Sequence, residues 1–182
     1  MLFLGKGLAV NTLNVEDLRA PVSNIRLAGI NPPSSQLYKG GEVLSFPTNQ
    51  DATLHVTFQI PHSWKTDSPI IIHIHWAIPT DGAGAGAENV KWDLTYSWAD
   101  TDELIPASTP LTVTKDVQAV SKDTHLYTAW AQITGTGHTI SSILLCSVTR
   151  DVDVANDYTG AVYLLEVDVH VQMDKLGSDS FF

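Results

Sequence analysis

Two histidines stand one residue apart in an otherwise apolar stretch, IIIHIHWAIP, at positions 70–79. Alternate side chains of an extended strand share a face, so His73 and His75 would lie about 7 Å apart on one side. Two imidazoles so placed could hold a transition metal if another strand supplied a third ligand. His55 and His170 are candidates for this ligand, because each falls on the polar side of its own alternating stretch.

The pair resembles part of the metal-binding pattern of the jelly-roll cupins, in which a carboxylate follows the second histidine closely and a third histidine lies on a later strand. The required glutamate is absent here, since Glu88 lies beyond a glycine-rich loop, and His138 falls in a turn. We therefore interpret His73 and His75 as core or subunit-interface histidines and predict no metal ligand and no cofactor. Two alternatives stay open: a cupin-like metal-dependent enzyme, and an ion bound where subunits meet.

A second stretch, EVDVHVQMD, places Glu166, Asp168 and His170 on one face of a strand. Carboxylates beside an imidazole could serve acid–base or glycosidase chemistry. The same alternation is also what an ordinary strand presents to solvent or to another subunit. No serine or cysteine has the context of a nucleophile elbow. We predict that the protein is not an enzyme and assign no catalytic residue.

Sugar binding has one aromatic candidate. Four of the five tryptophans fall within strand patterns, which favours core or interface positions. Trp64 falls in the loop PHSWKTDSP, where its ring could be exposed. A glycan-binding interpretation therefore depends on Trp64 alone.

The elements that position these residues are predicted to be strands. Apolar side chains recur with period two, as in ATLHVTFQI and VKWDLTYSWA, and turn signals separate the stretches. No segment has a convincing helical period. The pattern predicts an all-β, eight-stranded antiparallel jelly-roll sandwich over residues 51–182, with an immunoglobulin-like sandwich as second choice. The eight strands are Glu42–Phe46, Ala52–Ile60, Ile70–Ile78, Val90–Ala99, Leu111–Val117, Thr124–Ile133, Ser141–Arg150 and Ala161–Met173.

Residues 1–50 differ from the rest, because they are rich in proline and glycine and show no sustained period. We predict an extended N-terminal arm there, in which NVEDLRA makes one helical turn at most. The strand SSILLCSVTR is apolar on both faces, so the arm or a neighbouring subunit should cover it. This predicts an oligomer.

Composition excludes several functional classes. The chain has 182 residues, of which 43% are hydrophobic and 16% charged, enough for a packed core. Its formal charge of −10 disfavours nucleic acid and anionic membranes as partners. The single cysteine, Cys146, cannot form an intramolecular disulfide. No stretch resembles a signal peptide or a membrane span, so we expect a soluble protein made in a cytoplasm.

Several stretches together suggest a family: FQIPHSWKTDSPIIIHIHW, VKWDLTYSWA, TGTGHTISSILLCSVTRD and the final MDKLGS. From Thr53 to Ser178 the chain resembles small virion proteins of tailed bacteriophages, in particular the jelly-roll cement, or decoration, proteins of phage capsids. The resemblance implies a noncatalytic structural protein, made in the host cytoplasm, that binds the outer capsid surface as a homotrimer. Its partners would be the major capsid protein and itself, and it would clamp neighbouring capsid subunits. The alternative is a tail-fibre or receptor-binding head module that recognises a host glycan.

Overall fold

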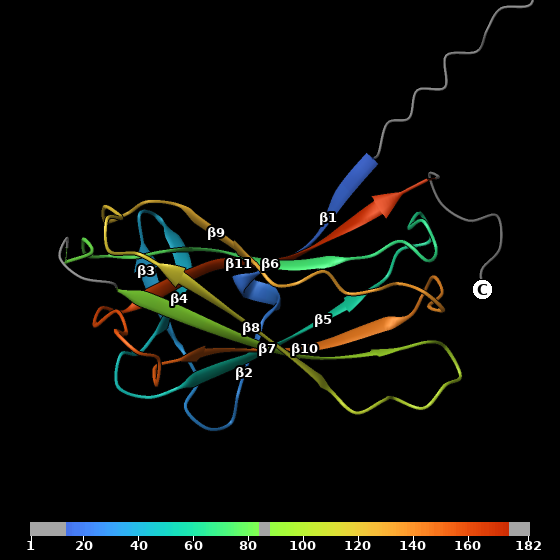
Figure 1. Cartoon of the computed structure of the whole chain (residues 1–182), viewed down its shortest axis with the longest axis horizontal. Helices are drawn as coiled ribbons and strands as arrows, with labels where there is room; N and C mark the ends of the chain where they lie inside the picture. Colours follow the sequence, from blue (N-terminus) through green and yellow to red (C-terminus); the bar gives the residue numbers. More distant parts are fainter. Residues whose placement is uncertain (1–13, 84–87, 175–182) are drawn as a thin grey trace, which may run out of the picture.

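The computed structural model describes residues 14–83 and 88–174. These residues form two antiparallel sheets packed face to face (Figure 1), which confirms the predicted all-β sandwich. The elements are β1 (Asn14–Pro21), a 3-10 turn (Val22–Asn24), β2 (Arg26–Leu27), β3 (Ser34–Tyr38), β4 (Gly41–Phe46), β5 (Ala52–Gln59), β6 (Ile71–Ala77), β7 (Asn89–Ala99), β8 (Thr109–Asp116), β9 (Leu126–Ala129), β10 (Ile143–Asp151) and β11 (Val162–Met173).

The eight strands expected from the sequence correspond to β4 through β11. One sheet, sheet A, has the order β3-β4-β11-β6-β9, with β1 also paired to β11, and the other, sheet B, has the order β2-β5-β10-β7-β8. The order β4-β11-β6-β9 facing β5-β10-β7-β8 is that of two interlocked Greek keys, the arrangement of a jelly roll. No helix in the described part of the chain is long and apolar enough to cross a membrane.

The structure corrects the prediction of an arm for residues 14–50. β1 pairs along its whole length with β11, from Asn14 opposite Met173 to Pro21 opposite Glu166, so NVEDLRA is a strand and not a helical turn. β2 pairs with β5, and β3 with β4. β2 and β3 are short, and all three strands bury few apolar side chains, so none shows an alternation that can be recognised in the sequence. Residues 1–13 lie outside the described residues.

The core lies between the sheets and is rich in tryptophan. Phe46 and Trp76 each pack edge-on against Trp92. The indole of Trp76 donates a 2.9 Å hydrogen bond to Thr128, so its polar atom is satisfied inside the sandwich. Cys146 is buried there as well, and this burial raises the pKa of its thiol to about 12.

β10 contributes to this core through one face only. Leu144 and Val148 are fully buried, whereas Leu145, on the opposite face, is 38% exposed. The predicted covering of this second face by the N-terminal arm or by another subunit stays a prediction.

Candidate functional site

A cluster of histidine and aspartate side chains lies on the outer face of sheet A. Ile72, Ile74 and Trp76 fill the core from β6, so the intervening His73 and His75 must face outward. On β11, the buried Val167 and Val169 alternate with Asp168 and His170 in the same way. Asp168 lies opposite His73 in the ladder between the two strands, and His170 lies opposite Asp17 of β1. Three adjacent strands therefore supply the cluster.

Asp168 lies between the two histidines of β6. Its Oδ2 atom is 3.3 Å from Nε2 of His75 and 3.6 Å from Nε2 of His73. One ligand atom from each of these residues lies within 4.8 Å of the other two. The arrangement is two imidazoles and one carboxylate, a donor set that zinc and non-haem iron sites use.

The central members of the cluster are buried without hydrogen-bond partners. His73 is 0% exposed and Asp168 is 2% exposed. Among the described residues, neither ring nitrogen of His73 has a hydrogen-bond partner. The Oδ1 atom of Asp168 accepts no hydrogen bond from them either. Leaving a buried polar group unpaired costs about 1–3 kcal/mol, so this cluster is destabilising unless another species contacts it.

A second His–Asp pair adjoins the first group. His170 Nε2 lies 2.8 Å from Asp17 Oδ1, and the rings of His170 and His73 are 4.1 Å apart. On the other side, His75 Nδ1 lies 2.8 Å from Nε2 of His125. The imidazoles thus form a continuous row across the sheet, from β11 toward β9.

The electrostatic surroundings favour the neutral imidazole at His75. Burial lowers the pKa of His75, and the neighbouring His73 lowers it further, while Asp168 opposes the shift. Arg19, opposite Asp168 on β1, donates a 2.7 Å hydrogen bond to Glu166, and this contact raises the pKa of Arg19. Among the described residues, no Lys or Arg pairs with Asp168. The groups in ion-pair contact with its carboxylate are therefore imidazoles, while Arg19 acts on it only at longer range.

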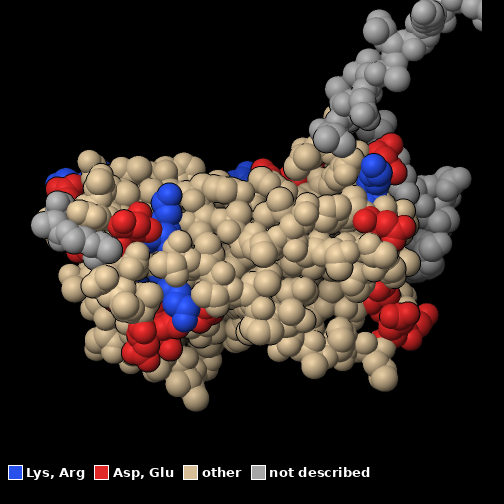
Figure 2. All heavy atoms as spheres, in the orientation of Figure 1, with Lys and Arg blue, Asp and Glu red and all other residues tan. Residues whose placement is uncertain are grey.

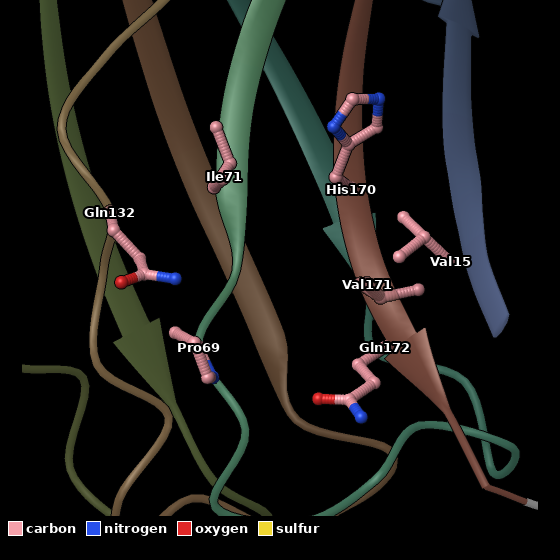
Figure 3. Close-up of a pocket in the computed structure, with 7 residues that line it drawn as sticks. All are labelled: Val15, Pro69, Ile71, Gln132, His170, Val171 and Gln172. Carbon is pink, nitrogen blue, oxygen red and sulfur yellow. The ribbon is translucent and has the colours of Figure 1, made fainter. Parts of the chain in front are cut away.

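A small groove adjoins the cluster on the same face of sheet A. It has a volume of about 180 Å³. Figure 3 shows His170 and Gln172 on β11, with Val15 of β1 on one side and Ile71 of β6 on the other. The lining is mainly apolar, so a ligand in this groove would contact one imidazole and the amides of Gln132 and Gln172 among aliphatic side chains.

The structure decides between the two candidates for a third histidine. His170 belongs to the cluster, whereas His55 lies on β5 in sheet B, with its ring 3.1 Å from the hydroxyl of Ser147. The prediction that His55 could share a metal ion with His73 is therefore wrong. The carboxylate missing from the sequence after His75 is supplied by Asp168 from β11. Asp17 could not be found from the sequence, because its strand was expected to be an arm.

Trp64 is placed differently from the prediction. Its side chain is 0% exposed and packs against Trp98, with ring centroids 5.7 Å apart. The loop around it folds back onto β11, where the amide of Lys65 donates a hydrogen bond to the carbonyl of Gln172. The proposed exposure of Trp64 is wrong, so this ring is not available to stack on a sugar.

Comparison with known proteins gives only distant similarities. No protein-family model and no curated protein sequence matches the chain. Among solved structures, a xylan-binding domain from Paenibacillus barcinonensis is 12% identical with a TM-score of 0.48, over 90% of this chain and 97% of that one. A family 22 carbohydrate-binding module of Clostridium thermocellum is 13% identical with a TM-score of 0.44, over 83% and 88%. A mannan-recognising module, TmCBM27, is 12% identical with a TM-score of 0.43, over 88% and 99%. None of these similarities bears on what this chain binds.

Proposed function

We propose that this protein is a noncatalytic structural protein of a phage virion, which binds the outer capsid surface as a trimer and clamps neighbouring capsid subunits. A clamp needs at least two separate contact surfaces, one for each subunit that it joins. The resemblance of the sequence to cement proteins suggests the partner, and the distribution of exposed apolar side chains supports the role.

The observation that carries the proposal is a pair of apolar sites at opposite ends of the sandwich (Figure 1). Leu37, on the edge strand β3, is 79% exposed. At the other end, Leu104 and Ile105 in the β7–β8 connection are 93% and 65% exposed. Burying such side chains on a partner removes apolar area from water, which favours binding.

The charge distribution is consistent with assembly. In the face shown in Figure 2, most Asp, Glu, Lys and Arg gather toward the two ends of the molecule, and the central part is uncharged except along its upper edge. A chain with a formal charge of −10 would repel its own copies through an acidic face, whereas an uncharged face avoids this cost.

Binding to capsid shells tests the proposal. The full chain should cosediment with shells assembled from the major capsid protein of its phage, and sedimentation velocity should give three times the chain mass. Leu37→Asp and the double variant Leu104→Asp with Ile105→Asp should each weaken shell binding. Leu27→Asp, at an exposed leucine of β2 in sheet B, is the matched control. Absence of wild-type binding to the shells would refute the proposed function.

Recognition of a host glycan is a second candidate, favoured by a hollow on the outer face of sheet B. Its volume is about 240 Å³. The hydroxyl groups of Thr57, Thr95, Ser97 and Ser147 line it, together with the imidazole of His55 and the side chain of Leu145. Hydroxyls and imidazoles can donate to and accept from sugar hydroxyls. Glycan-array binding by the wild type that His55→Ala removes, and that Trp64→Phe leaves intact, would favour this function over the first.

A further inference from the structure

We propose that His73, His75 and Asp168 bind one divalent transition metal ion of the zinc class on the outer face of sheet A. Ligand atoms bound about 2.0–2.2 Å from a tetrahedral ion lie roughly 3.3–3.6 Å from one another. The carboxylate of Asp168 lies 3.3 Å from His75 Nε2 and 3.6 Å from His73 Nε2. Two of the three distances between ligand atoms thus already match such an ion, and the two imidazoles offer nitrogens within 4.8 Å of each other.

The unpaired polar atoms of the cluster are a second, independent observation. His73 is 0% exposed and, within residues 14–83 and 88–174, neither of its nitrogens has a hydrogen-bond partner. A histidine that serves only in packing usually donates one N–H to a carbonyl or carboxylate at hydrogen-bond distance. A bound ion would use the free lone pair of this imidazole together with the carboxylate oxygen of Asp168.

The charges that face the site favour a cation. Asp168 and Asp17 contribute carboxylates. Arg19 lies opposite Asp168 and interacts with it coulombically, but its guanidinium pairs with Glu166 at 2.7 Å. The remaining groups that line the cluster are imidazoles and the ring of Tyr127, which lies 4.8 Å from His73. Three protein ligands leave at least one coordination position for water or for a group from another molecule.

His170 and Asp17 would support the site from beside it. The ring of His170 lies 4.1 Å from that of His73, and its Nε2 contacts Asp17 at 2.8 Å. Outer groups of this kind fix the orientation of metal-binding imidazoles. The ion would therefore tie β6 to β11 directly, and β1 would be coupled to it through this pair.

Cobalt and zinc titrations of the full chain, freed of metal by a chelator, test the proposal. Co²⁺ should produce the intense visible absorption of a tetrahedral site with a stoichiometry of one ion per chain, and Zn²⁺ should displace it. Asp168→Asn and His75→Gln should each weaken binding more than about 100-fold, because removal of a supporting group already costs 10- to 100-fold. His55→Gln, at an exposed histidine of sheet B, is the matched control.

Each outcome decides the question. Absence of the tetrahedral spectrum in the wild type, or equal loss of binding in His55→Gln and His75→Gln, would overturn the metal site. If circular dichroism shows that Asp168→Asn is unfolded, the variant at His75, whose side chain is 25% exposed, decides alone. The result is independent of capsid binding, because metal binding is measured on the isolated chain.

Discussion

The His138–Asp100 pair and the His73–Asp168 pair have the same residue types, but the first is fully hydrogen-bonded and the second is not. At the end of sheet B, His138 Nδ1 lies 2.7 Å from Asp100, and the ring stacks on Trp98 at 3.9 Å. Asp100 also accepts hydrogen bonds from the amide and the hydroxyl of Thr139. On sheet A, His73 and Asp168 are more deeply buried but 3.6 Å apart, and both retain unpaired atoms.

This difference separates a structural pair from a binding site. The protein itself completes the hydrogen bonds of Asp100, so that carboxylate holds the loop after β7 against the segment before β10. The protein leaves Asp168 and His73 incomplete, at a cost that folding must offset elsewhere. The following predictions test whether the two pairs are as different as their geometry indicates.

Zinc should stabilise the fold through the sheet A cluster alone. A ligand that binds only the folded state at 100 times its Kd raises the free energy of unfolding by about 2.7 kcal/mol. We expect this increase in urea unfolding of the wild type and of Asp100→Asn, but not of Asp168→Asn. A zinc effect that persists in Asp168→Asn would contradict the distinction between the two pairs.

Without metal, replacing Asp100 should lower the free energy of unfolding more than replacing Asp168. Asp100→Ala leaves the Thr139 amide and the His138 ring without their acceptor, and should lower the free energy of unfolding by about 1.5–3 kcal/mol. Asp168→Ala removes an acid with an unpaired buried oxygen, and should cost less than about 1 kcal/mol. Chemical denaturation in the presence of a chelator measures both, and equal costs would show that Asp168 is also a structural residue.

The pair beside the site should have a smaller effect on metal affinity than the ligands. Asp17→Asn removes the carboxylate that contacts His170 and should weaken Zn²⁺ binding about tenfold. Isothermal titration calorimetry measures this change, with Glu16→Gln on the same strand as control. If Asp17→Asn equals Asp168→Asn in effect, Asp17 itself is a ligand.

The smallest expected effect is the pH dependence of the stability that the His138–Asp100 pair contributes. Burial alone would raise the pKa of Asp100, but hydrogen bonds from Thr139 and His138 together hold it below its ordinary value. A carboxyl with a lowered folded-state pKa stabilises the fold above its unfolded pKa of about 4, and this contribution is lost as the pH falls through the folded-state value. Wild type should therefore lose more stability than Asp100→Ala between about pH 6 and pH 3. Parallel stability curves for the two proteins would exclude this contribution.

The strands of the jelly roll could be predicted because their alternation is long. β5 and β7 each alternate buried and outward side chains over eight residues or more, and these ranges agree with the predicted ones within a few residues. β1 buries only Ala20 fully, so its sequence looks like a polar linker. Its place beside β11 depends on backbone pairing, which side-chain polarity does not encode.

The candidate site was predictable only in part for the same reason. The spacing of His73 and His75 is local, and the period of the strand places them on one face whatever the rest of the fold does. Asp168 is 93 residues or more away from either histidine along the chain, and the pairing of β6 with β11 alone brings it to them. No pattern within one strand reveals such a partner.

The amino-acid sequence by itself determined the strand period, the apolar core, the outward position of the two histidines of β6 and the strongly negative charge of the chain. The tertiary structure decided which strands are neighbours. It therefore decided that Asp168 and His170 meet His73, that His55 does not, and that Trp64 is buried. The physical reason is that side-chain alternation is a local property of each strand, whereas the contacts across a sheet depend on the order in which distant strands form hydrogen bonds.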